Sequence, residues 1–231
     1  MIHLPQFFKL DDGCWCATAQ IAFNTQQSAD SNLGDSQRHQ PTNHTLNIQR
    51  LAVRALCQAL MSHLNITDDI DERSFPYRLS QAGHYLCFSH SQSQVAVILN
   101  TQRPSGVDIE AREVSWRLAQ RFYHDDEITQ LQNIEPPLCA QLCRHLWQIK
   151  ECLVKIEQTT LIATLGQSCA QLIPEIINAA RINELTSTHY PCQSAQQDNS
   201  QQLIVLSETL LVNQDSYRIG LILAEQLVVI F

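Results

Sequence analysis

Two short stretches of the chain place charged side chains at spacings that could do chemistry. The first, GVDIE, covers residues 106–110. Side chains of a β-strand alternate between its faces, so a strand here would put Asp108 and Glu110 on one face and Val107 and Ile109 on the other. Two neighbouring carboxylates repel each other and are costly to desolvate; a bound cation that prefers oxygen ligands, such as Mg²⁺, would remove that cost. The alternative is a polar strand face that stays in water.

The second stretch, HLWQIKECLVKI at residues 145–156, holds Lys150 and Lys155, two of the three lysines in the chain. On a helix, Trp147, Glu151 and Lys155 would follow one another at intervals of four residues and share a face. The neighbouring core face would consist of Leu146, Ile149, Leu153 and Ile156. A lysine is a compact charge that can neutralise a phosphate oxygen or pass on a proton. The alternative is a surface Glu–Lys pair worth about 0.3–0.5 kcal/mol.

The elements that would position these residues alternate between strands and helices. Hydrophobic periodicity predicts an amphipathic helix at 46–64, followed by further strands and helices. These are strands at 85–89, 95–99 and 105–110, helices at 114–123 and 125–131, a longer helix opened by Pro136 and Pro137, and antiparallel strands at 203–212, 217–225 and 226–231. Residues 24–45 and 185–202 are polar and are expected to form loops. We therefore expect an α+β fold with two halves, 1–103 and 104–231.

Composition excludes several classes of protein. The chain has 231 residues, of which 44% are hydrophobic, enough for a sizeable core. A net charge of −8 argues against a general nucleic-acid-binding protein. The nine cysteines are odd in number and contain no C-x-x-C, so we expect reduced thiols. No apolar run approaches the roughly 20 residues that span a bilayer, and no signal peptide is apparent; we expect a cytoplasmic protein that binds no membrane.

Taken together, the two charged stretches resemble a known enzyme family. G-V-D-I-E, followed some forty residues later by W-x-x-K-E-x-x-x-K, is similar to the signature of the 4′-phosphopantetheinyl transferase superfamily, in particular its longer, pseudodimeric, Sfp-like members. Three further segments strengthen the resemblance: FSHS at 88–91, RFYHDDE at 121–127 and VRAL at 53–56. The resemblance covers about residues 45–160.

This resemblance implies a fold, a reaction and a set of site residues. The fold would be two similar α/β halves with the active site in the cleft between them, 1–103 on the coenzyme A side and 104–231 carrying the catalytic motifs. The reaction would be that of a holo-[acyl-carrier-protein] synthase: the phosphopantetheine arm of coenzyme A moves to a serine of an apo acyl or peptidyl carrier protein, releasing adenosine 3′,5′-bisphosphate. The implied ligands of Mg²⁺, or Mn²⁺ in its place, are Asp108, Glu110 and Glu151. The implied contacts to coenzyme A are Ser89, His90, Lys150 and Lys155, with Arg54 at the nucleotide end. The implied catalytic residues are Glu127, Lys150, Glu151 and Lys155, with Lys155 positioned for the phosphates or the leaving group.

The sequence departs from the family pattern in two places. Many Sfp-like members carry Gly-Lys-Pro before the Ser-His-Ser element, whereas this chain has Ser74-Phe75-Pro76 with Arg73 and Arg78 nearby. We expect an arginine such as Arg78 to substitute for the absent lysine. The glycine-rich turn that often follows the second lysine is also absent after Lys155.

Several alternatives stay open at this point. The serine proton could go to Glu127, or to Glu110 or Glu151 through a metal-bound water. Arg117 and Arg121, one helical turn apart, could dock an acidic carrier together with Arg112, or could be ordinary solubilising charges. A non-catalytic coenzyme A or carrier-protein binding module and an unrelated metal-dependent phosphate-ester hydrolase are the rival functions. A monomer is expected, because two fused halves would already form the cleft.

Overall fold

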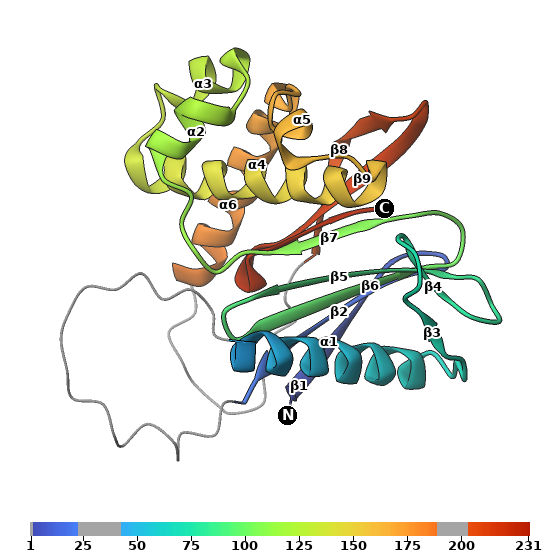
Figure 1. Cartoon of the computed structure of the whole chain (residues 1–231). Coiled ribbons are helices and arrows are strands. Elements are labelled where there is room, and N and C mark those ends of the chain that lie inside the picture. The colour runs from blue at the N-terminus through green and yellow to red at the C-terminus, as the bar shows by residue number, and fades with distance from the viewer. Residues whose placement is uncertain (1, 23–42, 189–202) are drawn as a thin grey trace.

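The computed structural model describes residues 2–22, 43–188 and 203–231, whose strands form two antiparallel sheets (Figure 1). The first sheet has the order β1-β2-β6-β5-β4-β3 and the second has the order β7-β10-β9-β8. The strands of the first are β1 (Ile2–Asp11), β2 (Cys14–Ile21), β3 (Ile70–Asp71), β4 (Tyr77–Leu79), β5 (Tyr85–Ser91) and β6 (Gln94–Asn100). Those of the second are β7 (Gly106–Ile109), β8 (Leu203–Val212), β9 (Asp215–Ile222) and β10 (Leu227–Ile230). The chain therefore passes from one sheet to the other between residues 100 and 106.

The helices cover the outer faces of the two sheets (Figure 1). They are α1 (Asn43–His63), α2 (Trp116–Phe122), α3 (Asp125–Leu131), α4 (Pro136–Glu157), α5 (Leu161–Leu165) and α6 (Ile173–Thr188), with short 3₁₀ turns η2 (Ala170–Leu172) and η3 (Leu223–Glu225). Helix α1 packs on the first sheet and α4 on the second. The layers thus run helix, sheet, sheet, helix.

The alternation of strand side chains explains this layering. On β6, Val95, Val97 and Leu99 pack toward α1, whereas Ala96 and Ile98 enter a separate cluster between the two sheets. The second sheet supplies Val107, Ile109, Leu227 and Val229 to the same cluster. Buried cysteines of the first sheet complete it. A third cluster joins α4 and its neighbours to the outer face of β9 and β10. Both sheets are consequently buried on two faces near the middle of the molecule.

Close packing of α4 against β7 requires a glycine at position 106. A Cβ atom there would lie 2.7 Å from both Cβ and the carbonyl oxygen of Cys152, which is shorter than real Cβ contacts allow. Cys152 is fully buried, so the helix has no room to move away. Gly106 thereby lets the helix that carries Glu151 and Lys155 approach the strand that carries Asp108.

The expected α+β architecture is confirmed, as are most of the predicted elements. Helix α1 begins at Asn43, so residues 43–45 of the predicted first loop are helical, and 185–188 of the second belong to α6. Those ends of the two loop predictions were wrong because Asn, His, Ser and Thr each cost a helix only up to about 0.7 kcal/mol, which the buried faces of α1 and α6 offset. The remainder of these loops, 24–42 and 189–202, lies outside the described residues.

Other predictions have mixed outcomes. Strand β7 ends at Ile109, so Glu110 lies just beyond it, and sequence reasoning missed the hairpin of β1 and β2. The eight cysteines in the described part are all free thiols, and Cys192 lies outside it. None of the described helices is long and apolar enough to cross a membrane. The division into two similar halves, 1–103 and 104–231, stays a prediction.

Candidate active site

Asp108 and Glu110 are each tied to a serine hydroxyl of the neighbouring strand β5. Ser89 Oγ donates to Asp108 Oδ1 at 2.9 Å and accepts from the next backbone amide of β7 at 3.2 Å. Ser91 Oγ repeats the pattern, donating to Glu110 Oε1 at 2.7 Å and accepting from the following amide at 3.1 Å. These hydroxyls join β5 of the first sheet to β7 at the edge of the second, and they fix the direction of both carboxylates. Asp108 and Glu110 thus both point toward the Ser-His-Ser segment of β5, as expected if they share a face.

Lys155 reaches the same carboxylate from α4. Its Nζ lies 3.0 Å from Asp108 Oδ1 and donates to the carbonyl oxygen of Val107 at 2.7 Å. Burial, the largest single effect, lowers the pKa of Lys155, but the charge and hydrogen bond of Asp108, with Cys87 and Cys152 nearby, together hold that pKa above its ordinary value. Burial also raises the pKa of Asp108, which Lys155 opposes. Lys155 is therefore a fixed cation beside a buried carboxylate.

Glu151 brings a third carboxylate to this place. Burial, and then the negative charges of Asp108 and Glu110, raise the pKa of Glu151 above its usual range, with Lys155 acting in the opposite direction. Among the described residues it has no ion pair within 4.0 Å. The three carboxylates line one cavity of about 280 Å³, whose walls are Phe88, Ser89, His90, Asp108, Ile109, Glu110, Trp147, Glu151 and Lys155. Strand β5, strand β7 and helix α4 each contribute to it.

The donor set of this cavity fits a hard cation. Asp108, Glu110 and Glu151 offer oxygen atoms alone, which is the chemistry that Mg²⁺ and Mn²⁺ prefer. Their mutual repulsion, which adds to burial in raising the pKa of Glu151, is what a cation would relieve. As the side chains stand, no three His, Cys, Asp or Glu residues of the described chain are arranged to hold a metal ion. The ammonium of Lys155 supplies the positive charge at Asp108 instead.

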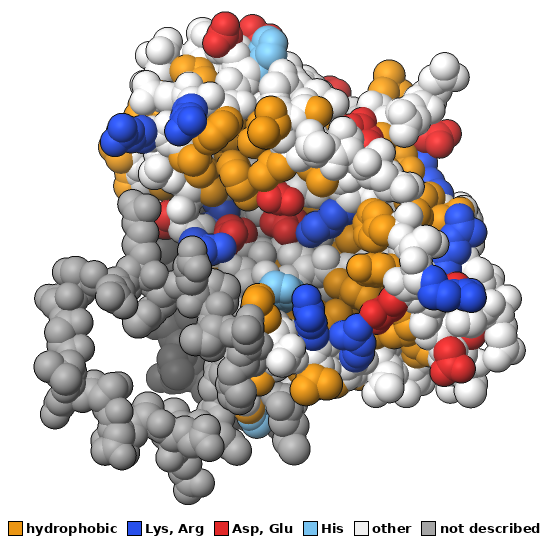
Figure 2. Space-filling view, viewed as in Figure 1, with side chains coloured by type: hydrophobic (Ala, Val, Ile, Leu, Met, Phe, Trp, Pro, Cys, Tyr) orange, Lys and Arg blue, Asp and Glu red, His pale blue; other side chains and the backbone are white. Residues whose placement is uncertain are grey.

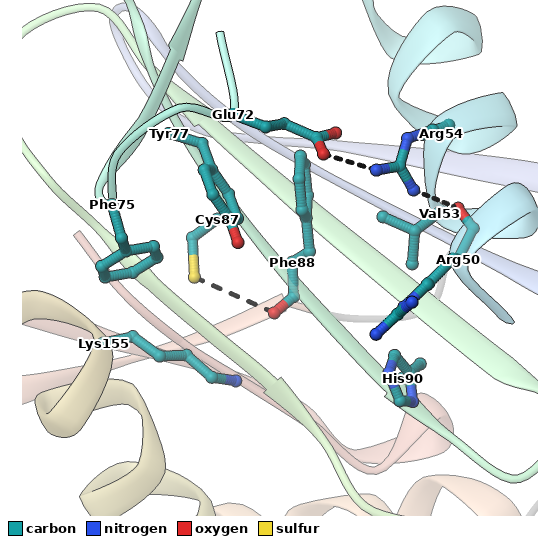
Figure 3. Close-up of a pocket in the computed structure, with 10 residues that line it drawn as sticks. All are labelled: Arg50, Val53, Arg54, Glu72, Phe75, Tyr77, Cys87, Phe88, His90 and Lys155. Atoms are coloured by element: carbon teal, nitrogen blue, oxygen red, sulfur yellow. Dashed lines mark hydrogen bonds and ion pairs between the residues drawn. The ribbon is translucent and has the colours of Figure 1, made fainter. Parts of the chain in front are cut away.

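A second, larger cavity of about 480 Å³ adjoins the first (Figure 3). Phe88, His90 and Lys155 line both cavities. The walls of the larger one are Arg50, Val53, Arg54, Glu72, Phe75, Tyr77, Cys87, Phe88, His90 and Lys155. In Figure 3, Lys155 enters from α4 on one side and the two arginines enter from α1 on the other. The space is suited to an anion that extends from the carboxylates toward α1.

Positive charge in the larger cavity comes from Arg50, Arg54 and Lys155. Arg54 is held by an ion pair to Glu72, whereas no side-chain carboxylate of the described residues lies within 4.0 Å of Arg50. Burial, and then the charges of Lys155 and Arg50, lower the pKa of His90. Sequence reasoning missed Arg50 as a binding residue; its position one helical turn before Arg54 was the available signal.

Aromatic rings form the other wall of this cavity. Phe75 meets Tyr77 edge-on with ring centroids 5.2 Å apart, and Tyr77 stacks on Phe88 at 5.4 Å. Sequence reasoning gave none of these three rings a role, because isolated aromatic residues are more often part of a core. Together they offer an apolar surface opposite the arginines.

Arg78, the expected substitute for the missing lysine, points elsewhere. Its guanidinium carbon lies 4.2 Å from the ring centroid of Tyr85, and it donates to the Tyr85 hydroxyl at 2.9 Å. Arg78 is not among the residues that line either cavity. Arg73 pairs with Asp71 and lines neither cavity as well. The structure therefore brings Arg50 and Arg54, rather than Arg73 or Arg78, to the place where an anion would lie.

Lys150 and Glu127 form a separate, fully buried pair. Lys150 Nζ lies 3.0 Å from Glu127 Oε1, and both side chains have 0% exposure. Lys150 also donates to the carbonyl oxygens of Leu165 and Gln167. Glu127 accepts from the backbone amide of Cys169 at 2.9 Å and closes the N-terminal cap of α3. Neither residue lines the two cavities, so the structure does not bring these two predicted catalytic residues together with the carboxylates.

The surface around the carboxylates is mixed in charge. Figure 2 shows acidic side chains gathered in the middle of one face, with Lys and Arg side chains to either side and apolar side chains beside them. Arg112, Arg117 and Arg121 are all exposed, and Arg112 lies 3.4 Å from Glu110 Oε1. The expected basic residues of α2 are thus available to a partner, on a protein whose net charge is −8.

Comparison with known proteins agrees with this geometry. No curated protein matches the chain. Residues 104–219 match the family described as the 4′-phosphopantetheinyl transferase superfamily, and this segment covers half of the chain and contains β7 and α4 with Asp108, Glu151 and Lys155. With the carboxylates and lysine brought together as described, the chain belongs to the 4′-phosphopantetheinyl transferase superfamily.

Proposed function

We propose that the protein transfers the 4′-phosphopantetheine arm of coenzyme A to a serine of an apo acyl or peptidyl carrier protein. The observation that carries this proposal is the junction of the two cavities at Phe88, His90 and Lys155. A triad of carboxylates lies on one side of this junction and a cavity with two arginines lies on the other. The diphosphate of coenzyme A and the phosphorylated nucleotide attached to it need both. The Sfp-like character of the chain and its pseudodimeric division belong to the same proposal.

The residues of the smaller cavity would hold the reacting diphosphate. Asp108, Glu110 and Glu151 are the groups that would bind Mg²⁺ or Mn²⁺, which when bound neutralises charge on the phosphate oxygens. Lys155 lies beside Asp108 and would offer its charge to the phosphate that leaves. Ser89 is 7% exposed and already donates to Asp108, so its role is to orient that carboxylate rather than to contact coenzyme A.

The larger cavity would hold the adenosine bisphosphate end of coenzyme A. Arg50 and Arg54 would pair with phosphate oxygens, and the lowered pKa of His90 keeps this ring neutral and able to donate one hydrogen bond. The rings of Phe75 and Tyr77 offer a stacking surface for the base.

Glu151 is the carboxylate best placed to accept the serine proton. It lines the smaller cavity, whereas Glu127 is already occupied by Lys150 in the interior. Asp108 and Glu110, by contrast, each already accept a hydrogen bond from a serine hydroxyl. In the transfer, the serine oxygen forms a new bond to the phosphorus that carries pantetheine, its proton goes to Glu151, and the bond from that phosphorus to the adenosine bisphosphate breaks.

Intact-mass measurement tests the proposal. The protein is incubated with coenzyme A, Mg²⁺ and several apo-carrier proteins, alongside Asp108→Asn and the control Asp12→Asn, which alters an exposed carboxylate paired with Lys9. A carrier that gains the phosphopantetheine mass with wild type and Asp12→Asn, but not with Asp108→Asn, supports transfer. Coenzyme A binding without transfer indicates a binding module. Coenzyme A breakdown without a carrier indicates a hydrolase.

A further inference from the structure

Gln148 is a buried amide on α4 whose Nε2 group donates to two carbonyl oxygens in other parts of the molecule. Its side chain is 0% exposed. Nε2 donates to the carbonyl oxygen of Asp108 at 3.2 Å and also to that of Gln226. Oε1 lies 3.2 Å from Nδ1 of His145, one turn earlier on the same helix. Both amide hydrogens and the amide oxygen therefore have partners, a complete set for a side chain that water does not reach.

His145 determines which way this amide points. It is 2% exposed, and burial, assisted by the neighbouring Arg144 charge, lowers its pKa to about 4. A neutral ring with its proton on Nδ1 donates to Gln148 Oε1, because the amide oxygen can only accept. The Nε2 group of Gln148 is then directed toward the carbonyl oxygens of Asp108 and Gln226. A flip of the amide would place its oxygen against both carbonyls, which the low-dielectric interior makes costly.

The two carbonyl oxygens that accept from Gln148 belong to Asp108 and Gln226, and both lie beside the backbone of the two carboxylates of β7. Gln226, a left-handed residue (φ 51°) between η3 and β10, offers a carbonyl oxygen that accepts from the amide of Glu110 at 3.3 Å as well as from Gln148. Gln148 is thus bonded to Asp108 directly and shares an acceptor with Glu110. The strand ladder ends at Ile109, so Glu110 lies just where backbone pairing with β10 stops.

We infer that Gln148 is a positioning residue, which holds the backbone of Asp108 and Glu110 at a defined distance from Glu151 on its own helix. This inference rests on the proposed function, in which those three carboxylates bind a divalent cation. Gln148 touches none of the reacting groups; it acts through the two carbonyl oxygens. Groups of this kind, which orient ligands from behind, typically change metal affinity by about 10–100-fold when removed.

The test compares Gln148→Met with a matched loss of a buried amide elsewhere. Asn100 is 5% exposed and also makes three hydrogen bonds, to Ser105 and to the amides of residues 102 and 103, at the other end of β7. Asn100→Leu therefore controls for the general cost of losing such a group. Mn²⁺ affinity is measured by calorimetry, and hydrogen exchange of the Glu110 amide is followed in the same proteins without metal.

We expect Gln148→Met to weaken Mn²⁺ binding about 10–100-fold and to speed exchange of the Glu110 amide at least 10-fold, with Asn100→Leu changing neither. His145→Phe, which frees the amide to flip, is expected to give smaller changes in the same direction and serves if Gln148→Met does not fold. Wild-type exchange at Glu110 in both Gln148→Met and His145→Phe would overturn the inference. If wild type binds no Mn²⁺, the proposed function fails, and the exchange rates still decide whether Gln148 holds this strand.

Discussion

Replacement of Glu127 distinguishes between two roles for this residue, a structural partner of Lys150 and the catalytic base. Glu127→Gln keeps the shape of the side chain and an oxygen for the amide of Cys169, but it leaves the Lys150 ammonium without its counter-charge. If the pair is structural, the loss is one of folding stability. If Glu127 accepts the serine proton, the loss is one of kcat.

The size of the stability loss follows from the geometry. At 3.0 Å, two unit charges attract by about 5–6 kcal/mol with an effective dielectric constant of about 20. Removal of one partner of a buried pair costs about 3–5 kcal/mol, because the other charge stays buried. A domain is stable by about 5–15 kcal/mol in total, so Glu127→Gln should fold at low temperature with a much lower urea midpoint. Glu127→Gln with Lys150→Met removes both charges and should recover part of the loss.

Urea unfolding and kcat at low temperature are measured for Glu127→Gln, Lys150→Met and the double variant. The structural interpretation expects each single variant to lose about 3–5 kcal/mol, the double variant to lose less than their sum, and kcat of the folded protein to stay within a few-fold of wild type. The opposite pattern would refute this reasoning: wild-type stability in Glu127→Gln, with kcat lower by about 10²–10⁴-fold in both variants that lack Glu127.

Three further outcomes are expected. Ser91→Ala removes the hydroxyl that orients Glu110 and should lower stability by about 1–3 kcal/mol and weaken Mn²⁺ binding in calorimetry, whereas Ser91→Thr should largely retain both. Burial and the Asp108 charge raise the pKa of Glu151 in the metal-free protein, so protons should compete with Mn²⁺ above the ordinary titration range of a glutamate; Mn²⁺ affinity in calorimetry should fall with pH there, and less steeply in Glu151→Gln, and an equally steep fall in this variant contradicts the assignment. Burial lowers the pKa of His145 to about 4 in the folded protein, against an ordinary 6.5, so between these pH values only the unfolded chain binds the extra proton. The free energy of unfolding should therefore fall by up to about 3 kcal/mol as pH drops from 6.5 to 4, and His145→Gln should lack this contribution.

Local patterns were enough to predict the main components of the candidate site. Alternation along 106–110 separates Asp108 from Val107, and the structure confirms that Val107 packs between the sheets while Asp108 faces α4. The four-residue spacing of Glu151 and Lys155 predicts a shared helix face, and both line the smaller cavity. These predictions succeed because the period of a strand or helix depends on the backbone alone.

The same reasoning could not assign the partners of these side chains. The Lys150–Glu127 pair looks like two further catalytic residues from sequence, because nothing local shows that both are buried away from the cavities. Arg78 is a reasonable substitute for a missing lysine until its stacking on Tyr85 is seen. Burial and partner choice depend on which distant segments fold against each other, and single-residue patterns do not contain that information.

By itself, the sequence determined the residue types of the site, the strand and helix that carry them, the α+β class and the resemblance to a transferase family. Each of these follows from local periodicity or from a motif. Only the tertiary structure decided that Ser89 and Asp108, 19 residues apart, share a hydrogen bond, and that Gln148 reaches the backbone of Asp108 from 40 residues away. Such contacts form because β5, β7 and α4 each bury an apolar face, and burial of those faces brings their polar edges together at one place.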